Sequence, residues 1–213
     1  MKINNFYSAL TNCFFVAILL INITAQAQEI TSERKIFIQD SLAFELSKIY
    51  GFDQGIRDRS LSLAITKHSQ EIDTLNFNKM VAFVIKHGYP TVAIVGERNM
   101  KQEAVKTAFV AVLLHNPHRL VNEKYYYDLF FEEVKKGRIS AELFATVLDK
   151  YYWIKSKNKT TKRVFYGSAF GSPCIQTKKE TNKARIEIGL KPLLDSEFVD
   201  CAGEELIMPK VRT

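Results

Sequence analysis

His115 is the residue of this chain that is best suited to proton-transfer chemistry, because a histidine changes its charge near neutral pH. It follows Val112 by three positions and therefore shares the inward face of a predicted helix. Paired with Asp53 or Asp149, it would act as a general base with an orienting carboxylate. Ser168 is the one candidate nucleophile beside another motif, and it lacks the Gly-x-Ser-x-Gly elbow. The sequence therefore indicates a candidate base without an evident nucleophile.

Two predicted helices around a tight turn position this histidine. In the first, apolar residues between positions 77 and 84 recur at helical spacing, and Gly88 ends the helix. We interpret Asp73 and Asn76 as helix-start residues, because a cap requires side chains of this type. The second helix closes on His115, after a short apolar link. The histidine is therefore expected at a helix end, on the side that faces the core.

Further helices are predicted on both sides of this pair. Before the pair, we expect helices over about residues 30–50 and 57–69. After it, we expect one helix that begins at the cap Asn122, another that begins at the cap Ser140, and a short helix over residues 181–188. Two glycines predict a break over residues 51–57. The fold class that follows is mainly α: a single compact helical domain of about six longer helices. A small β-hairpin element is expected near residues 163–177.

The N-terminal segment, residues 1–27, is predicted to be a signal peptide. Lys2 precedes an unbroken apolar run over residues 14–21, and Ala25-Gln26-Ala27 forms a small-x-small cleavage site. The run is far shorter than the ~20 residues that span a bilayer, so no transmembrane segment is expected after cleavage. We therefore expect residues 28–213 to form one exported domain, either periplasmic or secreted.

The composition argues against several kinds of site. The net charge of +7 is spread along the chain, and its densest basic stretch, residues 155–163, lacks interleaved aromatic residues. Nucleic acid is therefore not an expected partner. There is no CxxC, HExxH or Gly-rich phosphate loop, so we predict no metal and no cofactor. Cys174 and Cys201 remain after export, and the sequence leaves their pairing and the oligomeric state open.

A series of short motifs extends over about residues 50–198. They are Asp53-Gln54 with Arg57, Asp73 with Asn76, Gly88-Tyr89-Pro90-Thr91, Val95-Gly96, His115, Leu148-Asp149, Tyr166-Gly167, and Arg185 with Gly189-Leu190-Lys191-Pro192-Leu193. Their order and spacing resemble the bacterial domain-of-unknown-function family 6624, which is common in exported proteins. The family name supplies no activity. The polar residues at these motif positions are Asp53, Gln54, Arg57, Asp73, Asn76, His115, Asp149, Tyr166 and Arg185.

The chain departs from the pattern of that family at two motifs. The family usually has Asp-Arg where this chain has Asp149-Lys150, and Tyr-Gly-Thr-Gln where this chain has Tyr166-Gly167-Ser168-Ala169. Lysine cannot reproduce the planar, bidentate donor geometry of arginine. Alanine removes an amide that both donates and accepts hydrogen bonds. A polar site shared by the family would therefore be degraded in this member.

Two functions are consistent with these residues. The first, which we prefer from the sequence, is a non-catalytic domain that binds a protein, a peptide or a cell-envelope ligand, with binding candidates Gln54, Arg57 and Arg185. The alternative is a hydrolase-like enzyme, with catalytic candidates His115, Asp149, Asp53 and Tyr166. The substitutions at positions 150 and 169 and the missing nucleophile favour binding.

Structural roles for the same residues compete with both functions. A histidine on an inward helix face is more commonly a hydrogen-bonded core residue than a catalyst. We therefore expect the ring of His115 to be mostly shielded and bonded to Asp53, Asp149, Tyr166 or the backbone of residues 88–96. Such a bond would tie the central helices to the C-terminal segment. Asp149 and Arg185 would then form a buried ion pair that fixes the fold.

Overall fold

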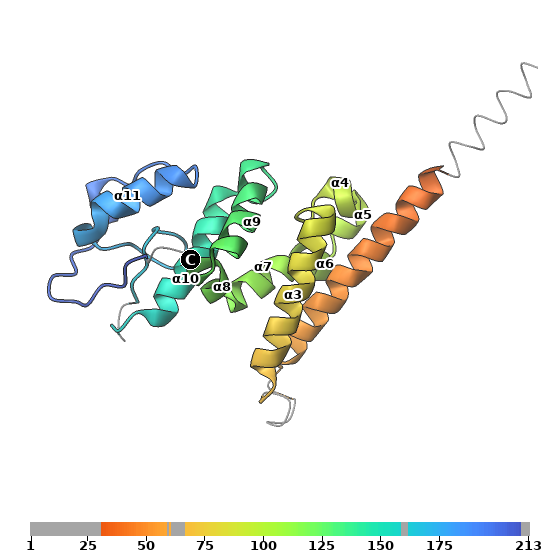
Figure 1. Ribbon diagram of the computed structural model, residues 1–213, viewed down its shortest axis with the longest axis horizontal. Coiled ribbons are helices and arrows are strands. Elements are labelled where there is room, and N and C mark those ends of the chain that lie inside the picture. The colour runs from red at the N-terminus through yellow and green to blue at the C-terminus, as the bar shows by residue number, and fades with distance from the viewer. Residues whose placement is uncertain (1–30, 59, 61–66, 159–161, 210–213) are drawn as a thin grey trace, which may run out of the picture.

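Helices make up most of the part of the chain that the computed structural model describes, which is residues 31–58, 60, 67–158 and 162–209. The first half contains a long helix over residues 31–55, α3 (Ser69–His87), three single-turn helices and α7 (Ala108–His115). The single-turn helices are α4 (Val92–Val95), α5 (Glu97–Met100) and α6 (Glu103–Lys106). In Figure 1 the C-terminal part of the 31–55 helix lies beside α3, where Nδ2 of Asn76 donates to the carbonyl of Ile49, and α7 leads from α3 toward the second half.

The second half is built around α10 (Ala141–Lys155). This helix packs against α7, α8 (Pro117–Asn122) and α9 (Lys124–Lys135). The chain ends in η1 (Ile175–Thr177), α11 (Lys178–Glu187) and η2 (Asp195–Glu197). The predicted single, mainly helical domain is confirmed for the described residues. Among them, no helix has the length and apolar character needed to cross a bilayer. The predicted signal peptide, residues 1–27, lies outside the described residues.

One apolar core runs through both halves. Leu46 and Met80 are fully buried between the 31–55 helix, α3 and their neighbours, and Phe77 forms an edge-to-face pair with Tyr126 of α9 at 4.9 Å between ring centroids. Burying each such side chain stabilises the fold by roughly 1.5–3 kcal/mol. The apolar residues that recur at helical spacing in the sequence are therefore the residues that form this core.

The 31–55 helix is longer than predicted. The chain remains helical through Gly51 and ends at Gly55, where the sequence predicted a break over residues 51–57. Ile49 and Asp53 lie one turn apart and are both buried, so they continue the inward face of the helix. Burial of Ile49, together with the hydrogen bonds of Asp53 to His115 and Gln54, offsets the ~1 kcal/mol that a glycine costs inside a helix. The helix predicted over residues 57–69 falls largely outside the described residues.

Several helix ends also differ from the predictions. Helix α3 begins at Ser69, so Asp73 and Asn76 lie inside it and are not caps. Asn122 is the last residue of α8 instead of the cap of α9. The prediction for Ser140 is confirmed, because its Oγ accepts a hydrogen bond from the N–H of Leu143 at 3.1 Å. Gly88 caps the end of α3 as predicted, with a positive φ of 82°.

The predicted β-hairpin is wrong. In the described part of the chain there is no strand near residues 163–177, and two isolated bridges join Val164 to Pro173 and Cys174 to Val199. The physical reason is that the carboxylate of Asp149 accepts hydrogen bonds from backbone N–H groups that a hairpin ladder would need. This irregular segment is instead closed by a disulfide between Cys174 and Cys201, with 5.6 Å between their Cα atoms.

Candidate functional site

His115 is bonded to Asp53, one of the partners predicted for it. Its Nδ1 lies 2.9 Å from Oδ1 of Asp53, and Nε2 of Gln54 donates to Oδ2 of the same carboxylate at 2.8 Å. Asp53 is completely buried, whereas the side chain of His115 keeps 29% of its surface exposed. An ionised carboxylate can only accept hydrogen bonds, so the geometry suits the tautomer of His115 that has its proton on Nδ1. The bond to Asp53 therefore fixes the position of Nδ1, while part of the His115 side chain remains accessible to solvent.

Arg57 joins this pair to a second carboxylate. Its NH2 group donates to both oxygens of Asp73, at 2.7 and 2.8 Å. Its NH1 group donates to the backbone carbonyl of Asp53 at 2.6 Å and lies 3.4 Å from Oδ1. The Arg57 side chain is 29% exposed. We call Asp53, Arg57, Asp73 and His115 the His115 centre.

Three helix ends bring these four residues together. Asp53 lies in the last turn of the 31–55 helix, Asp73 in the second turn of α3, and His115 at the end of α7. Asn116 follows His115 and donates to the carbonyl of Val112 at 3.0 Å and to that of Asp73 at 3.4 Å. The centre therefore ties the N-terminal helical pair to α7. The sequence predicted a tie to the C-terminal segment, which is wrong, whereas the ring is mostly shielded, as predicted.

Neither Asn116 nor His118 stands out in the sequence as a site residue. Helical spacing could not have related His118 to His115, because Asn116 separates α7 from α8. His118 is exposed, yet partial burial lowers its pKa, and the charge of Arg119 acts in the same direction. The nearby carboxylates of Glu123 and Asp73 oppose this shift. His118 therefore lies within electrostatic reach of the His115 centre.

The same residues have one feature of a metal site. Asp53, Asp73 and His115 each offer a ligand atom, and these atoms lie within 4.8 Å of one another. However, the guanidinium of Arg57 already binds both oxygens of Asp73. A cation would have to displace Arg57 from this carboxylate. The donor set therefore fits proton transfer better than metal binding.

Asp149, Tyr166 and Arg185 do not join the His115 centre. Oδ1 of Asp149 accepts from the N–H groups of Phe165 at 2.9 Å and Tyr166 at 2.7 Å, and Oδ2 accepts from that of Ser168 at 3.0 Å. Arg185 donates to the carbonyls of Tyr166, Gly167 and Lys191. We call residues 165–169 with Asp149 and Arg185 the loop centre.

The ion pair predicted between Asp149 and Arg185 is therefore wrong. The carboxylate holds the N–H groups of the loop and the guanidinium holds its carbonyls, so each charge is bonded to backbone instead of to the other. Burial raises the pKa of Asp149 to about 6, although the hydrogen bonds from Tyr166, Phe165 and Ser168 act in the opposite direction. Tyr166 itself is buried, and it takes part in this arrangement through its backbone.

Lys150 stands where the resembled family has arginine. Its Nζ lies 4.3 Å from the ring centroid of Trp153 and 4.9 Å from that of Phe170. Partial burial lowers the pKa of this lysine. A cation over two aromatic faces is a packing interaction, so in this chain Lys150 contributes to the fold beside the loop centre.

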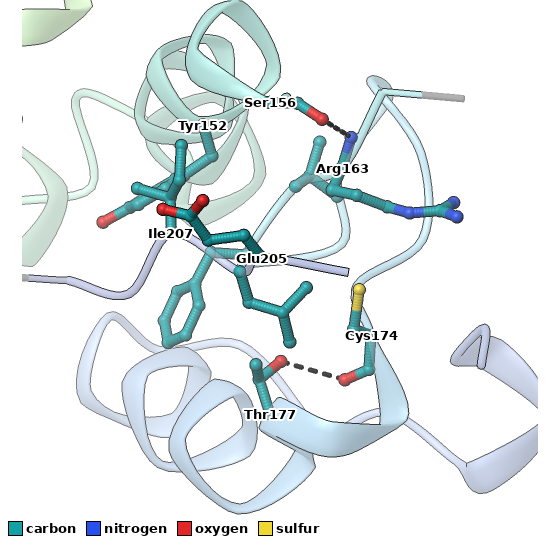
Figure 2. Close-up of a pocket in the computed structure, with 10 residues that line it drawn as sticks. Tyr152, Ser156, Arg163, Cys174, Thr177, Glu205 and Ile207 are labelled. Atoms are coloured by element: carbon teal, nitrogen blue, oxygen red, sulfur yellow. Dashed lines mark hydrogen bonds between the residues drawn. The ribbon is translucent and has the colours of Figure 1, made fainter. Parts of the chain in front are cut away.

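A small cavity lies next to the disulfide. Figure 2 shows Thr177 bonded to the carbonyl of Cys174 and the N–H of Arg163 bonded to Ser156, on opposite sides of Glu205 and Ile207. The volume of this cavity is about 20 Å³, which is close to the space that one water molecule requires. This cavity is therefore too small for a substrate.

Comparisons with known proteins do not identify the function. No protein-family model matches the chain, and no curated protein or solved structure is significantly similar to it. The resemblance to domain-of-unknown-function family 6624 stays a prediction. The functional argument therefore rests on the geometry of the two centres.

Proposed function

We propose that this protein is an exported, hydrolase-like enzyme in which His115 acts as a general base. The observation that carries the proposal is the 2.9 Å bond between the partly exposed His115 and the fully buried Asp53. With its proton on Nδ1, the imidazole has a lone pair on Nε2 that can accept a proton from water or from a ligand hydroxyl. The carboxylate then stabilises the imidazolium that forms.

Other residues of the centre support this role. Gln54 and Arg57 bond Asp53 and keep its carboxylate in place. The partly exposed guanidinium of Arg57 is suited to attract a polar or anionic group of a substrate, or to stabilise developing negative charge. Among the described residues, no serine, threonine or cysteine bonds His115, and Ser168 belongs to the loop centre. The attacking group in this proposal is therefore water.

The disulfide supports the exported location. Cys174 and Cys201 are bonded, and such bonds persist mainly in oxidising compartments. This agrees with the predicted signal peptide over residues 1–27 and favours a substrate outside the cytoplasm.

The tautomer of His115 tests the proposal without a known substrate. Long-range ¹H–¹⁵N NMR spectra of the neutral imidazole should show the proton on Nδ1, and Asp53→Asn should shift the population toward the other tautomer. A proton found on Nε2 in the wild type would refute the general-base role.

Activity provides the second test. The purified protein would be assayed with chromogenic esters, phosphoesters, glycosides and aminoacyl anilides. Any turnover should fall by about 10²–10⁴-fold in His115→Asn, the usual contribution of a general base. His68→Asn is the matched control, because His68 is an exposed histidine bonded to Glu71 at the surface. Turnover that survives in His115→Asn contradicts the assignment.

Binding without catalysis is the second candidate function. The specific observation in its favour is that, among the described residues, no nucleophilic side chain forms a hydrogen bond with His115. In that case the His115 centre holds a protein, peptide or envelope ligand, and His115→Asn weakens binding while no substrate is turned over.

A further inference from the structure

A second, larger hollow lies beside the loop centre. It has a volume of about 560 Å³, within the roughly 300–1,000 Å³ that is typical of small-molecule sites. It lies between α10, the loop at residues 167–169, α11 and the segment at residues 189–191. Its polar lining includes Glu142 and Thr146 on one wall and Arg185 and Lys191 on the other. We call it the Arg185 groove.

Backbone donors without partners line this groove. In the described part of the chain, the N–H groups of Gly167, Ala169 and Lys191 donate to no hydrogen bond. All three residues line the groove. Asp149 and Arg185 hold the loop rigidly from both sides, so the donors at positions 167 and 169 are fixed in advance. Preorganised N–H groups of this kind bind anions well.

Arg185 adds a charged donor to the same surface. The residue is only 9% exposed, and its Nε and NH1 groups are bonded to loop carbonyls. Its NH2 group donates no hydrogen bond to any described residue, and it is not among the side-chain atoms sealed from solvent without a partner. The NH2 group therefore keeps some accessible surface in the groove and has a free donor, and a carboxylate suits its geometry.

The opposite wall carries a negative charge. Glu142 lies in the first turn of α10 and within electrostatic reach of Arg185. A purely anionic ligand would be repelled by this carboxylate. A ligand that carries both a positive and a negative charge would be attracted to Glu142 on one wall and to Arg185 on the other. The lining therefore favours a small zwitterion over a phosphate or a nucleotide.

We propose that the Arg185 groove binds a short peptide with free ends. The terminal carboxylate is held by Arg185, by Lys191 and by the N–H groups of Gly167 and Ala169, and the terminal ammonium faces Glu142. This proposal is independent of the activity proposed for His115, because none of the groove residues belongs to the His115 centre.

Titration with alanyl-alanine, followed by ¹H–¹⁵N NMR of the full disulfide-bonded protein, tests the proposal. The amide signals of Gly167, Ala169 and Lys191 should shift in a saturable way. The C-terminal amide of the same peptide should bind at least about tenfold more weakly, because it lacks the negative charge that strengthens the hydrogen bonds from Arg185 and the loop. Acetate alone should bind more weakly than the peptide. Equal affinity for the free and amidated peptides, or the absence of shifts at these amides, would overturn the proposal.

Variants test the groove without touching the residues that hold the loop. Ala169→Gln should fill the groove and abolish the shifts, while Lys183→Gln, an exposed change on α11 outside the groove lining, should leave them unchanged. Glu142→Gln should weaken binding of the free peptide and leave that of the N-acetylated peptide nearly unchanged. Unchanged spectra away from the groove confirm that each variant is folded. Wild-type binding by Ala169→Gln would refute the assignment.

Discussion

The His115 centre and the loop centre each place a fully buried aspartate near an arginine, yet the two aspartates have different partners. Asp53 bonds the side chains of His115 and Gln54, and the histidine is partly open to solvent. Asp149 bonds the N–H groups of three loop residues. A buried carboxylate that holds a titratable side chain prepares it for chemistry. One that holds backbone determines the shape of a loop.

Removal of the loop carboxylate should have the largest effect. Asp149→Ala leaves three backbone N–H groups without their acceptor, each at a cost of about 1–3 kcal/mol. We expect the free energy of unfolding to fall by roughly 4 kcal/mol in urea melts. An unchanged midpoint would show that the loop is not held as described, and the distinction between the two centres would fail.

The pH dependence of stability should also separate the centres. The pKa of Asp149 is raised to about 6 in the folded protein, above its ordinary value of 3.8. Protonation of Asp149 therefore contributes fully to stability below pH 3.8, and this proton-linked contribution is lost as the pH rises through about 6, while the hydrogen bonds to the loop remain. Relative to Asp149→Asn, the free energy of unfolding of the wild type should fall by roughly 3 kcal/mol as the pH rises from below the lower of these values to above the higher one. The reason is that a tenfold change in proton affinity is worth about 1.4 kcal/mol. Denaturant melts of both proteins at pH 4 and pH 7 measure this difference, and a constant difference contradicts the prediction.

Gly167 tests how closely the loop packs. Its φ is +70°, and an added Cβ would lie 2.8 Å from Cδ1 of Leu193 and 3.0 Å from Cδ of Pro173. We expect Gly167→Ala to destabilise the protein by roughly 2 kcal/mol, from backbone strain and overpacking together. Gly137→Ala is the control, because Gly137 has a similar φ of +68° and open space around it. Equal melting temperatures for the two variants would argue against close packing at the loop.

The smallest stability change is expected at the His115 centre. His115→Ala removes one hydrogen bond from a partly exposed side chain, so we expect a loss of about 1 kcal/mol. A loss as large as that of Asp149→Ala would favour a structural role for the histidine. Thermal and urea melts of the two variants, measured together, make this comparison directly.

Local patterns in the sequence predicted much of the helical framework. The helix that ends at His115, the cap at Ser140 and the stop at Gly88 depend on neighbouring residues, and these features are confirmed. The bond between His115 and Asp53 was one of several alternatives, because helical spacing shows which face a residue occupies and does not show what lies opposite. The sequence named Arg185 as a binding candidate, but no local pattern shows that residues 142–146 lie across a groove from it.

The sequence by itself determined that this chain forms helices around an apolar core, since the period of apolar residues is a local property. The tertiary structure decided which partner each buried polar residue found. Asp73 appeared suited to a helix cap, but Arg57, sixteen positions away, binds its carboxylate inside α3. Asp149 and Arg185 bind backbone that no spacing rule connects to them. Burial requires every polar group to find a partner, and only the packing of distant segments decides which one is within reach.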